Sequence, residues 1–156
     1  MKHLLWGVLI CLASLPLLQG QEQRPTLGPS EPSLHGPSSA KTTDQRRLLT
    51  IRKIYVERID NKLSDKIMEE LSKSSMLRIV DKQDDADAIL RGTCFQVRRL
   101  KRLHSEVYLS DRTSGSSIWQ DIVLVPWNPP SLNNAVDQSA AKIVTHLFES
   151  IQRAEK

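Results

Sequence analysis

The stretch EVYLSDRTSGSSIWQDIVLV, residues 106–125, decides the fold of this chain. Within it, two runs rich in β-branched and aromatic residues, 106–111 and 117–125, flank the short polar segment 112–116. Such runs favour strands, and the glycine of the connecting segment supplies the positive φ that a hairpin loop needs. The stretch therefore predicts an antiparallel β-hairpin, and the other elements can be placed around it.

Upstream of the hairpin, the pattern alternates between strand and helix. Residues 48–59 are rich in β-branched residues and predict a first strand. Ser64 predicts the N-cap of a helix with one apolar face. That face consists of Leu63, Ile67, Met68 and Leu71. A short strand is expected over 77–80, and a longer one, entered from the acidic loop 81–85, over 86–97.

Downstream of the hairpin, the proline-rich segment 126–130 ends the sheet, and Ser131 predicts the cap of a final helix. Apolar residues recur in that helix at helical spacing. They are Val136, Ala140, Ile143, Val144, Leu147 and Ile151. The element order is thus β-α-β-β-β-β-α. We predict an α+β fold, a two-layer sandwich with two helices on one face of a mainly antiparallel mixed sheet.

Residues 1–20 have the layout of a secretory signal peptide, with Lys2, an apolar run and the small residue Gly20 at the expected cleavage site. The apolar run is shorter than the roughly 20 residues that a spanning helix needs, and Pro16 breaks it. We expect a periplasmic or secreted protein with no membrane-spanning segment after cleavage. An uncleaved membrane anchor is the alternative, and attachment to the outer membrane stays open.

The chain has two cysteines, which could carry a lipid anchor or form a disulfide. Cys11 lies inside the apolar run behind the bulky residues 8–10, whereas a lipoprotein signal places its cysteine behind small residues at the end of that run. The sequence therefore argues against a lipid on Cys11 without settling the question. Cleavage leaves Cys94 as a single thiol, so no internal disulfide can form. We expect Cys94 to be a small buried hydrophobe, with a reactive thiol as the alternative.

The remaining chain divides into a tether and one domain. Residues 21–44 are polar and hold almost nothing apolar. Their prolines are Pro25, Pro29, Pro32 and Pro37. This composition predicts a disordered, extended tether that spaces the domain from a membrane or partner, or else an unselected tail. Residues 45–156 suffice for one core and predict a single α+β domain.

Charge singles out one segment. The chain carries 22 basic and 18 acidic residues, a mild excess that does not indicate a nucleic-acid-binding protein. Four cations nevertheless cluster at a predicted strand end or hairpin tip, namely Arg98, Arg99, Lys101 and Arg102. Strand alternation would place these charges on both faces. Because arginine binds oxyanions in a bidentate manner, acidic protein surfaces and anionic lipids or glycans are the predicted partners. A charged edge that resists aggregation is the alternative.

Trp127 is the second candidate contact residue. It stands in the proline-rich segment 126–130, where an exposed aromatic side chain could anchor a partner. Packing of the indole over the sheet edge is the alternative.

The sequence lacks the motifs of common enzymes and metal sites. It contains no G-x-S-x-G, no H-E-x-x-H and no Gly-rich phosphate loop. Neither the histidines after the signal peptide nor the acidic residues before the third strand have ligand spacing. These residues are His35, His104, His146, Asp84, Asp85 and Asp87. We therefore predict no catalysis, no cofactor and no metal ion.

Two motifs carry a resemblance to known proteins. They are A-D-x-x-L-x-G at residues 86–92 and D-x-x-x-G-x-x-x-W at residues 111–119. Together with the run 77–81 and the closing helix, they resemble a broad group of bacterial envelope domains, over roughly residues 48–153. The group includes the lipopolysaccharide-assembly lipoprotein, the curli-secretion pore lipoprotein, the lipoprotein activators of penicillin-binding proteins and the N-terminal domain of the Tol-system β-propeller protein. The resemblance implies a non-catalytic adaptor.

These observations predict a periplasmic interaction module that helps to assemble or regulate an envelope protein complex. Its expected contact residues are the four cations of residues 98–102 and Trp127. The alternative function is direct binding of an anionic envelope molecule, such as lipopolysaccharide, through the same basic segment.

Overall fold

The computed structural model describes residues 39–128 and 130–156. The predicted signal peptide, and the part of the predicted tether before Ser39, lie outside these residues. The described chain forms a six-stranded mixed sheet in the order β1-β6-β5-β4-β2-β3. The strands are β1 (Lys41–Thr42), β2 (Lys53–Val56), β3 (Arg78–Ile79), β4 (Ala88–Val97), β5 (Arg102–Asp111) and β6 (Ser117–Pro126).

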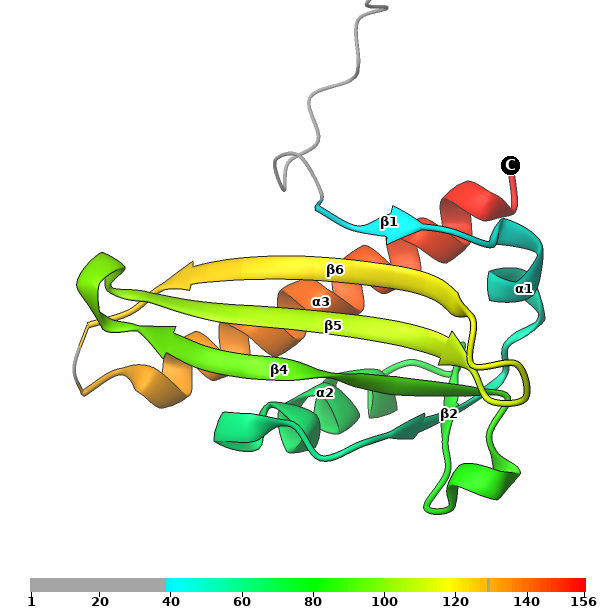
Figure 1. The fold of residues 1–156 in the computed structure, drawn as a ribbon, viewed down its shortest axis with the longest axis horizontal. Coiled ribbons are helices and arrows are strands. Elements are labelled where there is room, and N and C mark those ends of the chain that lie inside the picture. The colour runs from blue at the N-terminus through cyan, green and yellow to red at the C-terminus, as the bar shows by residue number, and fades with distance from the viewer. Residues whose placement is uncertain (1–38, 129) are drawn as a thin grey trace, which may run out of the picture. The chain divides into compact units, whose positions relative to one another are not determined.

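Two of the three α-helices lie on the same side of this sheet (Figure 1). The α-helices are α1 (Gln45–Thr50), α2 (Leu63–Ser72) and α3 (Leu132–Ala154). Short 3-10 turns are η1 (Asp60–Lys62), η2 (Gln83–Asp85) and η3 (Arg98–Leu100). Because α2 and α3 form one layer and the sheet the other, the predicted α+β two-layer architecture is confirmed.

The beginning of the domain differs from the prediction in two ways. Residues 48–50, expected to begin the first strand, end α1 instead, and the Asp44 carboxylate caps that helix by accepting from the Arg47 N–H at 2.9 Å. Leucine is compatible with a helix as well as a strand. The Asp44 cap and the burial of Leu48 therefore favour the helix at these residues. In addition, β1 lies within residues 21–44, where a tether was expected, and pairs with β6.

Two predicted helix caps also differ in detail. Helix α2 begins at Leu63, so the predicted cap Ser64 is inside the helix and buried, and Lys62 precedes it with a φ of 61°. Ser131 does precede α3, but its hydroxyl donates to the Asn128 carbonyl rather than capping the helix. A serine can satisfy its hydroxyl in a turn instead of at a helix terminus, which is why the residue type alone misplaces the cap.

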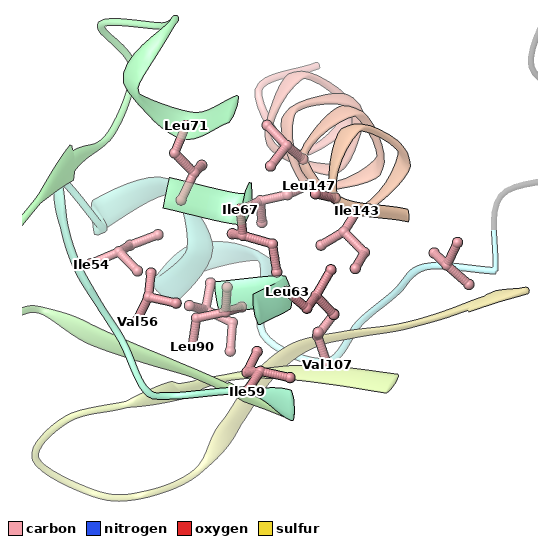
Figure 2. Close-up of a cluster of buried hydrophobic side chains, with 14 of the residues drawn as sticks. Ile54, Val56, Ile59, Leu63, Ile67, Leu71, Leu90, Val107, Ile143 and Leu147 are labelled. Carbon is pink, nitrogen blue, oxygen red and sulfur yellow. The ribbon is translucent and has the colours of Figure 1, made fainter. Parts of the chain in front are cut away.

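The core lies between the sheet and the two helices. Figure 2 shows strand residues such as Ile54, Leu90 and Val107 facing Ile67 of α2 and Ile143 of α3. All five are at most 1% exposed, so the apolar periodicities in the sequence correspond to real buried faces.

The A-D-x-x-L-x-G motif joins β4 to its neighbours. The Asp87 carboxylate accepts from the backbone N–H groups of Arg52 and Lys53, each at 2.9 Å, and so holds the start of β2. Burial acts to raise the pKa of Asp87, but these two donors and nearby cations outweigh it and lower that pKa. At Gly92, a Cβ atom would lie 2.2 Å from the Glu106 carbonyl oxygen of β5. Both motif residues therefore have conformational roles.

The second motif shapes the β5–β6 hairpin. The Asp111 carboxylate accepts from the N–H groups of Thr113 and Ser114, each at 2.8 Å, and forms an ion pair with Arg47. The Ser114 N–H, the Arg47 guanidinium and the Thr113 N–H outweigh burial and lower the pKa of Asp111 to about 2. Gly115 has a φ of 69°, as a hairpin loop requires.

Candidate functional site

The four predicted cations lie at the tip of the β4–β5 hairpin. These strands pair without interruption from Ala88↔Asp111 to Val97↔Arg102. Between them, η3 and Lys101, which has a φ of 48°, reverse the chain. The predicted strand alternation of charge is therefore wrong, because the turn interrupts the two-residue period. Instead, Arg98, Arg99 and Lys101 are exposed on the turn, and Arg102 is exposed at the start of β5. We call Arg98, Arg99, Lys101 and Arg102 the basic tip.

The charge of the basic tip is not neutralised locally. Within the described part of the chain, none of its four cations forms an ion pair, whereas Arg47, Lys66 and Arg91 each do. Four like charges at one hairpin tip create a positive field that the mild net charge of the whole chain conceals. The tip can therefore attract an anionic surface or molecule.

Trp127 lies beside the basic tip. Its backbone N–H donates to the Lys101 carbonyl at 2.9 Å, and its partly buried indole packs against the core. Gln96, Arg98, Lys101 and Trp127 line a pocket of about 380 Å³. The structure thus brings three predicted contact residues together, whereas Arg99 and Arg102 do not line this pocket. The indole Nε1 is buried and has no hydrogen-bond partner among the described residues.

The sequence did not reveal a second hollow, which lies between β6 and α3. It has a volume of about 390 Å³. Its lining consists of Ser39, Ile122, Val123, Leu124, Ala141, Lys142, Thr145 and His146. We call it the β6–α3 groove. One signal pointed towards it, because Asp121 occupies an inward-facing position of a strand whose neighbouring inward residues, Trp119 and Val123, are apolar.

In the described part of the chain, the histidines considered in the sequence lie apart from the acidic residues considered there. The described residues contain no group of three His, Cys, Asp or Glu side chains that could hold a metal ion. The His104 ring stacks on Phe95, with 4.7 Å between ring centroids, and His146 contacts Asp121. His35 lies outside the described residues.

Cys94 occupies a closed environment. It is 1% exposed, and burial raises the pKa of its thiol despite a weak contact from the Ser105 hydroxyl at 3.5 Å. The prediction of a small buried residue is confirmed. As for membrane insertion, none of the helices in the described ranges is both long enough and apolar enough to span a bilayer.

Comparison with known proteins finds similarity in fold and none in sequence family. No protein-family model matches this chain, and no curated protein sequence does. Among solved structures, a PelC dodecamer from Paraburkholderia phytofirmans matches 71% of this chain and 97% of its own, with 14% identity and a TM-score of 0.51.

Two further solved structures match with lower scores. A DUF4136 family protein from Bacteroides thetaiotaomicron has 8% identity, covers 74% of this chain and 94% of its own, and has a TM-score of 0.42. A putative lipoprotein from Caulobacter crescentus has 11% identity, covers 71% of this chain and 95% of its own, and has a TM-score of 0.38. The chain is thus similar in fold to PelC, and this likeness extends to the fold alone.

Proposed function

We propose that the protein is a non-catalytic interaction module of the bacterial cell envelope, exported to the periplasm, that binds an acidic surface of an envelope protein complex. The observation that carries this proposal is the basic tip, where four exposed cations have no ion-pair partner among the described residues. Complementary charge accelerates association and selects partners. The partly buried Trp127 beside the tip supplies an aromatic anchor of the kind that dominates interface energetics.

The similarity to PelC is compatible with this role. PelC was solved as a dodecamer, so chains of a similar fold contact one another in that assembly.

Crosslinking in cells tests the proposal. The full chain is compared with a quadruple variant of the basic tip, Arg98→Glu, Arg99→Glu, Lys101→Glu and Arg102→Glu. We expect a defined protein partner that the native chain captures and the variant loses, because reversed charges repel an acidic surface. Circular dichroism first establishes that the variant folds.

A matched control reverses the same number of charges elsewhere. Arg46, Arg58, Arg78 and Lys82 are exposed and form no ion pair with any described residue, so changing them to Glu alters the net charge equally. This control should keep the partner. An identical partner set for all three proteins would make the basic tip a charged turn without a binding role.

A second candidate function is direct binding of an anionic envelope molecule. The pocket lined by Gln96, Arg98, Lys101 and Trp127 favours it, because two cations there can face one phosphate or carboxylate group. Binding to lipopolysaccharide micelles should then weaken steeply as salt rises from about 0.1 M to about 1 M, since the Debye length falls from about 10 Å to about 3 Å. Failure of the micelles to bind at low salt would exclude this candidate.

A further inference from the structure

Among the described strands, none pairs with one edge of the sheet beside the β6–α3 groove. β1 pairs only with Trp119 and Gln120 of β6, and Figure 1 shows it alongside one end of that strand. No strand of the described chain pairs with the same edge from Ile122 to Pro126. An unpaired edge presents backbone donors and acceptors to any extended chain.

The direction of the free backbone groups follows from the strand geometry. The Ile122 carbonyl points away from β5, because its oxygen lies 2.5 Å from the Ser39 Oγ on the β1 side. With a period of two residues, the N–H and C=O groups of Leu124 point the same way. The open edge therefore offers a donor and an acceptor at Leu124. Pro126, two residues further on, has no N–H to offer.

The upstream segment of this chain is a poor occupant of the edge. The β1–β6 register pairs Lys41 with Gln120, so continuing it would place Pro37 opposite Leu124. Proline has no N–H and cannot form the reciprocal pair of hydrogen bonds that this position requires. The edge beyond Ser39 is therefore available to another chain.

The groove beside this edge has a defined chemistry. Ala141 and Thr145 of α3 lie one helical turn apart and leave room for an apolar side chain against Val123. Lys142 lines the same groove and forms no ion pair with any described residue. Arg102 of the basic tip pairs in register with Pro126 at the end of the edge. A peptide with acidic side chains on the outer face complements the unpaired Arg102, which shares that face with Leu124.

We propose that the β6 edge and the β6–α3 groove bind an extended acidic peptide of a partner protein, which adds as a strand antiparallel to β6 opposite Leu124. Main-chain hydrogen bonds supply affinity in this mode, and alternate side chains entering a groove supply specificity. The acidic character of the peptide rests in part on the proposed function, whereas strand addition does not.

The geometry assigns a role to each alternate peptide residue. Residues directly opposite each other share a face of the sheet. Leu124 is 44% exposed on the outer face, whereas Val123 is buried on the inner face. The peptide residue bonded to Leu124 therefore points outward, and its neighbours point into the groove. In a peptide that alternates glutamate and valine, the glutamate N–H groups face β6 and the valine side chains enter the groove.

Fluorescence anisotropy with such a peptide tests the proposal on the full chain. Three probes are compared, namely the parent peptide, a copy N-methylated on its glutamates and a copy N-methylated on its valines. We expect the glutamate-methylated copy to bind at least about tenfold more weakly, because it loses main-chain hydrogen bonds to β6, and the valine-methylated copy to bind like the parent. Equal binding by all three probes, or no binding by the parent, would overturn the proposal.

Variants on α3 locate the peptide in the groove. Ala141→Phe fills the groove and should abolish binding, whereas Gln152→Phe, at an exposed position of the same helix, should leave binding unchanged. Unchanged binding by a folded Ala141→Phe variant would exclude the groove.

The quadruple Glu variant of the basic tip separates this inference from the proposed function. This variant should bind all three peptides more weakly by the same factor, and the glutamate-methylated peptide should still bind most weakly of the three. Strand addition is thus confirmed or overturned whether or not the basic tip binds a partner.

Discussion

His146 Nδ1 lies 2.7 Å from Oδ2 of Asp121, a carboxylate that is 0% exposed. The other carboxylate oxygen accepts the Ser39 hydroxyl at 2.5 Å. This contact joins α3 to β6 inside the protein and ties the chain at Ser39 to both. A buried carboxylate is costly without partners, so these two contacts account for an acidic residue in an otherwise apolar layer.

Removing the imidazole should destabilise the fold. His146→Ala leaves Asp121 with Ser39 as its one side-chain partner, and we expect a loss of about 3 kcal/mol in the free energy of unfolding, measured by urea denaturation. The exposed Gln152→Ala on the same helix should change this free energy by about 0.5 kcal/mol or less. If His146→Ala matched Gln152→Ala, the contact would have no stabilising role.

Two glycine substitutions should differ in their cost. Gly92→Ala would drive a Cβ atom against the backbone of β5, and we expect a loss of at least about 2 kcal/mol in the free energy of unfolding. Gly115→Ala meets no atom within 4 Å and has only its φ of 69° to overcome, which costs about 1 kcal/mol. Urea denaturation of both variants checks the order, and a milder effect at Gly92 would contradict the close approach of β4 and β5.

Acid should weaken the β5–β6 hairpin through Asp111. Its pKa is lowered from 3.8 to about 2, so it contributes stability above the unfolded-state pKa, and this contribution is lost as the pH falls through about 4 towards 2. Asp111→Asn should lose about 2 kcal/mol at pH 7. The gap between the native chain and this variant should close over that acidic range, as measured by thermal unfolding at each pH. A gap independent of pH would show that the charge of Asp111 is irrelevant.

The Cys94 thiol should resist modification in the folded protein. Its burial and raised pKa reduce both access and thiolate content. Iodoacetamide should therefore label it only after denaturation, as peptide mass spectrometry at Cys94 can establish. Rapid labelling of the native protein would instead identify a reactive thiol.

Much of the fold was predictable because its signals are local. The hairpin within residues 106–125 has strand runs on both sides of a glycine-containing loop, and β5 and β6 occupy these positions. Helix α3 follows from its apolar spacing, and six residues chosen on that basis are all buried. These patterns work because strand and helix periods project onto buried faces whatever the partner element is.

Other features escaped prediction because they depend on contacts between distant segments. Leu48 and Leu49 suit either a strand or a helix, and packing against α3 and β6 decided for α1. The sequence predicted that the four cations lie at a hairpin tip, as they do in the structure. It also predicted that they alternate between two faces of a strand, which is wrong, because the left-handed conformation of Lys101 cannot be predicted from its residue type. The β6–α3 groove was missed because its walls come from residues well separated in the chain.

The sequence by itself determined the helix-and-strand order from β2 onward, the buried apolar positions of the helices and the concentration of cations at residues 98–102, all of which follow from composition and short-range periodicity. Only the tertiary structure decided that Trp127 lies against Lys101, that Asp121 meets His146 and that no described strand pairs with the β6 edge from Ile122 to Pro126. The physical reason is that strand order, and the packing of α3 on the sheet, bring together groups whose separation in sequence contains no information about their distance.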